Sequence, residues 1–217
     1  MTEEIFGKLK GRIDLNACTP IYDPAHLGGI HLANVVGGKL LAGLEDEVRR
    51  CRTSMTRARD DYAGVKQKMS ELYFGPADDK TQFLKVDNFP FMRALGYAYL
   101  EVVYNPLGAL KGYSPLETLS SVGLHWYGPN EGISFHRDYS HDRNLIGIFT
   151  LLGAGKFSVA SSREGRDAKS YLVEPGSLVL MRAPLDDSKE QRDLRPFHQI
   201  ESLSDERASI LFRTRVR

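Results

Sequence analysis

The chain has 217 residues, a length that suits one domain with a sizeable core. Its 29 basic and 28 acidic residues leave a formal charge of +1, so the composition lacks the strong positive charge of many nucleic-acid-binding proteins. Two cysteines make no disulfide framework, and we find neither a secretion signal nor a run of roughly 18 apolar residues, so we expect a cytoplasmic protein with no membrane segment.

The first third of the chain, residues 1–75, is expected to be a helical lead-in that supports the rest. Prolines and a glycine pair make residues 1–33 irregular. Apolar residues at helical spacing then predict an amphipathic helix over 35–52, which Asn34 would cap, and a more polar helix over 56–73. The apolar stripes of both helices are expected to pack on the core.

Residues 76–217 are expected to form a β-rich core, because turn residues separate short runs of strand-forming residues. The predicted strands span residues 97–104, 121–127, 133–139, 144–152, 156–161, 170–173, 177–181, 196–200 and 207–216. Short strands at regular spacing, preceded by helices, favour a single α+β (mainly β) domain over residues 1–217. Its architecture would be an antiparallel sandwich or jelly roll backed by helices.

A histidine and an aspartate lie two residues apart in the predicted strand 133–139. The strand period sends His136 and Asp138 to the same face, although this pair alone is more typical of a solvated strand. His198 follows 60 residues after Asp138 and is, by itself, either a buried core histidine or a ligand. Together the three form the ligand set of a 2-His-1-carboxylate facial triad, which suits Fe(II) and leaves coordination positions open.

The last predicted strand carries two arginines that point the same way. Arg207, Ser209 and Arg213 share one face, and apolar residues occupy the other. This face is either the exposed edge of a basic tail or an inward-facing anion site, because buried guanidinium groups need anionic partners. Two inward arginines near Fe(II) would suit a dicarboxylate cosubstrate, since a guanidinium pairs bidentately with a carboxylate.

Over residues of about 120–217 these motifs resemble the AlkB-like group of Fe(II)/2-oxoglutarate-dependent dioxygenases. The resemblance implies a double-stranded β-helix, or jelly roll, with N-terminal helices packed on it. It also implies that His136, Asp138 and His198 are the metal ligands and catalytic centre. The first third of the chain matches this family only loosely, as a helical lead-in.

The resemblance also assigns the cosubstrate contacts. In the family an Asn-x-Tyr strand lies eleven residues before the first metal histidine, and here His125 and Tyr127 stand at those two places. Tyr127 would donate its hydroxyl to a 2-oxoglutarate carboxylate, and His125 replaces the asparagine. Arg207 would bind the distal carboxylate, Arg213 would lie near the metal-binding end, and Ser209 stands where the family usually has an asparagine.

One departure from the family concerns the substrate. In members that repair DNA or RNA, an acidic pair after the metal motif holds the damaged base, whereas this chain has Ser140 and His141 there. Tyr139 and His141 would line the substrate pocket together with Ser140, or His141 would be an exposed loop residue.

The resemblance implies an oxidoreductase that uses Fe(II), 2-oxoglutarate and O2 to oxidise a C–H bond, with release of succinate and CO2. The outcome would be hydroxylation, or N-demethylation through a hydroxymethyl intermediate. The missing acidic pair and the near-neutral charge favour a small molecule, an amino acid or a peptide as substrate. A nucleic-acid or nucleobase demethylase, which would need a basic groove and an aromatic clamp, is the alternative. A non-catalytic binding module on the same scaffold is the third hypothesis, and the oligomeric state stays open.

Overall fold

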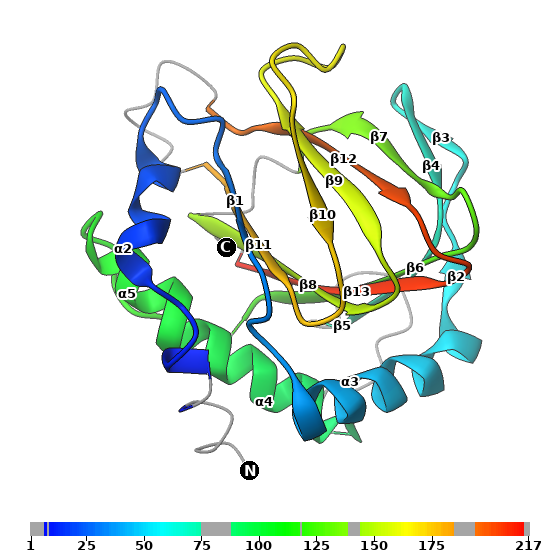
Figure 1. The fold of residues 1–217 in the computed structure, drawn as a ribbon, viewed down its shortest axis with the longest axis horizontal. Helices are drawn as coiled ribbons and strands as arrows, with labels where there is room; N and C mark the ends of the chain where they lie inside the picture. Colours follow the sequence, from blue (N-terminus) through cyan, green and yellow to red (C-terminus); the bar gives the residue numbers. More distant parts are fainter. Residues whose placement is uncertain are drawn as a thin grey trace.

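Two antiparallel sheets face each other in a computed structural model of the chain, and helices cover the outer face of the larger sheet (Figure 1). The structure describes residues 7, 9–74, 88–117, 119–138, 144–184 and 194–214. The predicted mainly-β jelly roll with helices packed on it is therefore confirmed.

The larger sheet has seven strands, and every neighbouring pair is antiparallel. Across the sheet the strands are β1 (Gly29–Leu32), β11 (Leu178–Arg182), β8 (Leu145–Leu152), β13 (Arg207–Arg213), β6 (Ser121–Tyr127), β5 (Ser70–Phe74) and β2 (Thr56–Arg57). Strand β13 lies at the centre, so its side chains reach both the helical layer and the space between the sheets.

The smaller sheet has six strands and lies over the inner face of the larger one (Figure 1). Across the sheet these are β10 (Lys169–Val173), β9 (Gly155–Ala160), β12 (Phe197–Ser202), β7 (Gly132–His136), β4 (Val65–Lys68) and β3 (Asp61–Tyr62). Strands β7 and β12 are neighbours, which brings the two halves of the predicted metal motif together.

The helical layer comes from two parts of the chain. Its elements are α2 (Leu15–Cys18), the 3-10 turns η1 (Thr19–Tyr22) and η2 (Arg52–Ser54), α3 (Gly38–Cys51), α4 (Pro90–Tyr99), the π-helical segment η4 (Leu100–Tyr104) and α5 (Asn105–Ala109). Helices α3 and α4 run beneath the larger sheet in Figure 1. No helix within the described ranges is both long and apolar enough to cross a membrane.

The alternation of β13 divides the apolar interior into two cores. Ala208, Ile210 and Phe212 belong to the core under the helices, whereas Leu211 belongs to the core between the sheets. Burial of an Ile, Leu or Phe side chain contributes about 1.5–3 kcal/mol. This gain holds the strand in one register, and the register determines which side of the sheet each of its other side chains faces. The face with Arg207 and Arg213 is consequently turned inward, and both residues are buried.

The predicted helix over residues 56–73 is wrong, because this stretch forms β2, β3, β4 and β5. Its apolar residues happen to fit helical spacing, but Ala63 and Gly64 adopt positive φ values of 52° and 75°. Such a two-residue turn suits a β-hairpin, and β3 pairs with β4 on either side of it. The lead-in therefore contributes strands as well as helix.

The predicted strand over residues 97–104 is also wrong, since α4 continues there into η4. Only Tyr97 and Glu101 are exposed in this segment, and their spacing of four is that of a helix. The remaining side chains are buried, so no amphipathic pattern marks the helix in the sequence. Helix α3 begins at Gly38 rather than Val35, and Asn34, at φ 55°, is not its cap.

The other predicted strands between residues 121 and 214 are found, and their ends differ from the prediction by at most three residues. They correspond to β6 to β13, which lie in both sheets. The part of the sequence that carries the predicted site was thus read correctly as strands.

Candidate active site

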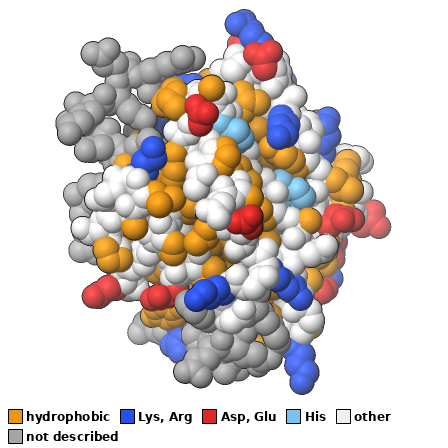
Figure 2. Space-filling view, turned by 60° about the vertical axis from the view of Figure 1, so that its left-hand side comes forward, with side chains coloured by type: hydrophobic (Ala, Val, Ile, Leu, Met, Phe, Trp, Pro, Cys, Tyr) orange, Lys and Arg blue, Asp and Glu red, His pale blue; other side chains and the backbone are white. Residues whose placement is uncertain are grey.

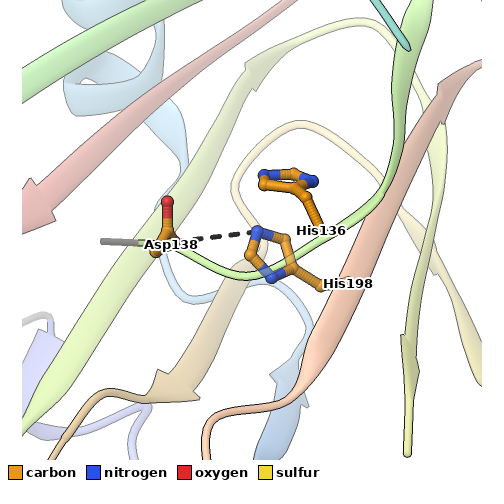
Figure 3. A group of neighbouring side chains, drawn as sticks. All are labelled: His136, Asp138 and His198. Atoms are coloured by element: carbon orange, nitrogen blue, oxygen red, sulfur yellow. Dashed lines mark ion pairs between the residues drawn. The ribbon is translucent and has the colours of Figure 1, made fainter. Parts of the chain in front are cut away.

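Two histidines and an aspartate converge at one end of the smaller sheet. His136 at the end of β7 lies directly opposite His198 on β12, and their ring centroids are 4.2 Å apart. Asp138 follows β7 and turns toward His198, with its Oδ2 3.6 Å from the Nε2 of that histidine (Figure 3). One potential ligand atom from each of the three residues lies within 4.8 Å of the other two.

The electrostatic state of these residues suits a divalent cation. Burial lowers the pKa of His136 and lowers that of His198 to about 3, so both rings are neutral and have a lone pair to offer. The Nδ1 of His136 lies 2.8 Å from the carbonyl of Ser134, which leaves the Nε2 of this ring as its donor atom. Burial opposes the charge of Asp138, but Arg213 and the histidines outweigh it, so its pKa lies below its usual value.

Asp138 has one oxygen that the protein satisfies and one that it does not. Its Oδ1 accepts a hydrogen bond of 2.8 Å from the Nη2 of Arg213. Its Oδ2 is buried, has no hydrogen-bond partner in the part of the chain that the structure describes, and faces His198. A buried carboxylate oxygen is costly to leave unpaired, so this atom and the two imidazoles fit a metal with mixed nitrogen and oxygen ligands, such as Fe(II).

A cavity of about 340 Å³, including its open mouth, extends from the two histidines between the sheets. Arg207 lies in it with 1% of its surface exposed, and none of the described residues that line the cavity is acidic. The Nη2 of Arg207 lies 3.3 Å from Thr150 Oγ1, and its guanidinium carbon lies 5.1 Å from the centre of the Tyr127 ring. Burial lowers the pKa of Arg207 without removing its charge. The cavity therefore holds a buried cation that lacks an anionic partner.

A glycine makes room for this cation. A Cβ at Gly155 on β9 would lie 2.7 Å from the Nε of Arg207. The close approach requires glycine, because the atoms in the way are a packed guanidinium and a backbone carbonyl. Sequence analysis did not place Gly155 or Thr150 in the site, although Thr150 is the polar residue in the otherwise apolar strand β8.

The remaining predicted cosubstrate residues line the same cavity. His125, Tyr127, Ser209 and Arg213 all reach it, and Ser209 lies between His125 and Thr150 in the strand register. Burial raises the pKa of Tyr127 to about 12, so its hydroxyl keeps its proton and can donate. The structure thus brings together every described residue that the sequence placed in the site.

His125 extends the site to β5, where sequence analysis expected a helix. Its Nε2 lies 3.3 Å from the hydroxyl of Tyr73, which in turn donates to Glu71 over 3.0 Å. Its Nδ1 lies 3.2 Å from the hydroxyl of Tyr127. Glu71 and Tyr73 were missed because their strand was misassigned, and an alternation of polar and apolar residues over 71–74 was the signal available.

Three predicted substrate residues, Tyr139, Ser140 and His141, lie outside the described residues, and so their placement in the pocket stays a prediction. Two neighbours of the site residues point away from them. Trp126 packs in the core under the helices, and Arg137 lies over the ring of Phe197 at 4.1 Å instead of joining the ligands.

Comparison with solved structures places this fold among oxygenases. A Pseudomonas putida prolyl-4-hydroxylase matches 92% of this chain and 99% of its own, with a TM-score of 0.57 and 17% identity. OsALKBH1 matches 86% of this chain and 98% of its own, with a TM-score of 0.58 and 13% identity. The alpha-ketoglutarate-dependent carbocyclase SnoK from nogalamycin biosynthesis matches 94% of this chain and 85% of its own, with a TM-score of 0.60 and 13% identity.

No protein-family model and no curated protein matches the sequence. At these identities the likeness to solved structures establishes the fold, which is that of the Fe(II)/2-oxoglutarate oxygenases, AlkB-like proteins among them. Fold and His-Asp-His group together support Fe(II), 2-oxoglutarate and O2 as the cofactors.

Proposed function

We propose that the chain is an Fe(II)- and 2-oxoglutarate-dependent dioxygenase that oxidises a C–H bond. One observation carries the proposal: the His136, Asp138 and His198 group opens into a cavity that also contains Arg207, a buried cation without an acidic partner among the described residues. A metal site and a carboxylate site in one cavity are what a chelating dicarboxylate cosubstrate requires.

The residues have distinct roles in this proposal. His136, Asp138 and His198 hold the iron, and Arg213 fixes the orientation of Asp138 through its hydrogen bond to Oδ1. Arg207 binds the distal carboxylate of 2-oxoglutarate. When bound, iron and 2-oxoglutarate would supply the oxidising chemistry, in which O2 is consumed, succinate and CO2 are released and a substrate C–H bond is oxidised.

Polar groups beside Arg207 complete the carboxylate site. Thr150 already accepts from Arg207, so its own hydroxyl proton is free to meet a carboxylate oxygen. Tyr127 would donate a further hydrogen bond, while His125 and Ser209 line the wall next to it. Apolar side chains, among them Ile148, Phe157 and Leu211, exclude water and strengthen these charged contacts.

For the substrate we propose a small molecule, an amino acid or a peptide. The near-balanced charge supports this choice. In the view of Figure 2 basic and acidic side chains are scattered among hydrophobic ones, and the described residues form no continuous basic stripe on that face. Among the structural neighbours, a prolyl hydroxylase is bound to a peptide fragment of hypoxia inducible factor, which shows that a protein with this fold accepts a peptide. A nucleic-acid or nucleobase substrate, the alternative from the sequence, is the other outcome that a substrate screen would detect.

The test is succinate formation by protein that was purified without oxygen and loaded with Fe(II). With 2-oxoglutarate and O2, and with methylated nucleotides, amino acids, peptides and metabolites screened in turn, wild type should form succinate. Asp138→Ala should form none, whereas the matched control Asp205→Ala, which removes an exposed carboxylate, should behave as wild type. Iron bound by wild type without succinate in any reaction would support the non-catalytic binding module instead.

A further inference from the structure

Four side chains form a continuous hydrogen-bonded relay from β5 into the cosubstrate cavity. Glu71 accepts from the hydroxyl of Tyr73, that hydroxyl contacts His125 Nε2, and His125 Nδ1 contacts the hydroxyl of Tyr127. The register of β5 against β6 brings these side chains together, since Glu71 lies directly across from His125. A Cβ at Gly123 would lie 2.9 Å from the Tyr73 ring, so glycine there lets the ring lie across β6 toward His125.

The number of protons in the relay determines the direction of every bond. An ionised Glu71 can only accept, so Tyr73 uses its single proton on Glu71 and must accept from His125 Nε2–H. Burial lowers the pKa of His125 to about 3, so the ring is neutral and its Nδ1 carries no proton. Tyr127 therefore donates to Nδ1. Three protons serve three bonds, and all of them point toward Glu71.

A cosubstrate carboxylate at Tyr127 adds a fourth bond to this count. If Tyr127 donates to the carboxylate, His125 must donate from Nδ1 to keep the Tyr127 contact, and its Nε2 must then accept from Tyr73. Tyr73 no longer has a proton for Glu71, so either this part-buried bond is lost or Glu71 takes up a proton and donates. An ionised Glu71 would then lie 3.0 Å from the Tyr73 oxygen with no proton between the two acceptors, which favours proton uptake.

We propose that Glu71 and Tyr73 are positioning residues for the cosubstrate, because they set the tautomer of His125. When 2-oxoglutarate binds, one proton enters at Glu71, the tautomer of His125 changes, and Tyr127 donates its proton to the cosubstrate. This inference rests on the proposed function, because it takes 2-oxoglutarate as the ligand beside Tyr127. No bond is made or broken other than O–H and N–H bonds along the relay. The added proton comes from solvent.

The surroundings of Glu71 allow this protonation. Glu71 is half-buried, and burial raises its pKa, while Tyr73 and the charge of Arg213 on β13 oppose the rise. His125 faces Glu71 from β6 and stays neutral. On β2, Arg57 is instead paired with Glu131. Because the complex binds one more proton than the free protein, 2-oxoglutarate affinity should fall by up to about tenfold per pH unit above the pKa of Glu71.

The starting tautomer is tested in metal-free protein with 15N-labelled histidine. The ring signals that disappear in His125→Gln identify this residue. Wild type should show a neutral His125 protonated at Nε2, and Tyr73→Phe, which removes the acceptor of that proton, should shift the ring toward the Nδ1–H form. An Nδ1–H tautomer in wild type, or no change in Tyr73→Phe, would overturn the inference without reference to iron or activity.

The proton uptake is tested by calorimetric titration of 2-oxoglutarate into anaerobic Fe(II) protein in buffers of different ionisation enthalpy. Wild type should take up more protons than Glu71→Gln, by about one per cosubstrate at a pH above the pKa of Glu71. Glu71→Gln should keep its affinity as pH rises from about 6 to 8, because its amide donates to Tyr73 permanently. Glu201→Gln, which removes an exposed carboxylate on β12, should match wild type.

The relay and the oxygenase function can be disproved separately. Equal proton uptake in wild type and Glu71→Gln, with 2-oxoglutarate bound by both, would overturn the relay and leave the oxygenase proposal intact. Absence of 2-oxoglutarate binding by iron-loaded wild type would overturn both.

Discussion

Replacing Arg207 by methionine should separate cosubstrate binding from protein stability. Arg207 is almost wholly buried, and its contacts include a hydrogen bond to Thr150 and the side chain of Tyr127. A buried guanidinium without an anion destabilises the free protein, so an apolar side chain of similar length should leave its stability unchanged or raised. The same change removes the charged partner of the 2-oxoglutarate carboxylate.

The expected loss of affinity can be estimated from that partnership. Hydrogen bonds to charged groups contribute about 1.5–3 kcal/mol each, and a guanidinium can offer two of them to a carboxylate. Taking the lower value for both gives about 3 kcal/mol, which corresponds to a rise of roughly 100-fold in the Kd for 2-oxoglutarate. Calorimetric titration of anaerobic Fe(II) protein measures this Kd, and urea unfolding of the same variant measures its stability.

Arg182 supplies a matched control, because it is a buried arginine whose described hydrogen bonds go to backbone carbonyls. Its guanidinium donates to the backbone carbonyls of Ile21, Asp23, His26 and Leu194. Arg182→Met leaves these acceptors unpaired and should lower the free energy of unfolding by about 3 kcal/mol or more. If Arg207→Met destabilises the protein to the same degree and binds 2-oxoglutarate as wild type does, Arg207 is structural and the carboxylate site is wrong.

Three further outcomes are expected. Asp138→Ala should lose stoichiometric Fe(II) binding in equilibrium dialysis, since one of the three ligands disappears; iron retained at wild-type affinity would exclude Asp138 as a ligand. Gly155→Ala should raise the Kd for 2-oxoglutarate with no change of charge, because the new methyl group would lie 2.7 Å from Arg207 Nε, and an unchanged Kd would show that the guanidinium position is unimportant. In metal-free protein, urea unfolding should show that the free energy of unfolding falls as pH drops from about 6.5 toward 3. The reason is that His125 and His198 have pKa values of about 3 in the folded protein, so the unfolded chain binds more protons than the folded one in this pH range. His125→Gln should flatten this dependence, and an equally steep dependence in that variant would contradict a buried neutral His125.

Much of the site could be predicted from the sequence because it lies on strands with a clear period of two. The alternation of β13 places Arg207, Ser209 and Arg213 opposite a row of apolar residues, and both rows occupy the expected sides. His136 and His198 were paired only through a motif, since strand neighbours separated by about 60 residues leave no local signal. The register between β7 and β12 supplies the physical reason for their convergence.

The errors have equally specific causes. Residues 56–73 contain apolar side chains whose spacing fits a helix, and the left-handed turn at Ala63 and Gly64 overrides that pattern. The segment 97–104 is buried on most sides, so its β-branched residues suggested a strand. The first error hid Glu71 and Tyr73, whose role depends on the pairing of β5 with β6 and not on any local motif.

A crystal structure of the protein prepared without oxygen, with Fe(II) and 2-oxoglutarate, tests the proposed site most directly. Anomalous diffraction at the iron edge should give one strong peak among His136, Asp138 and His198, with the distal carboxylate of 2-oxoglutarate on Arg207. Iron bound elsewhere, or 2-oxoglutarate absent from the cavity that contains Arg207, would contradict the assignment.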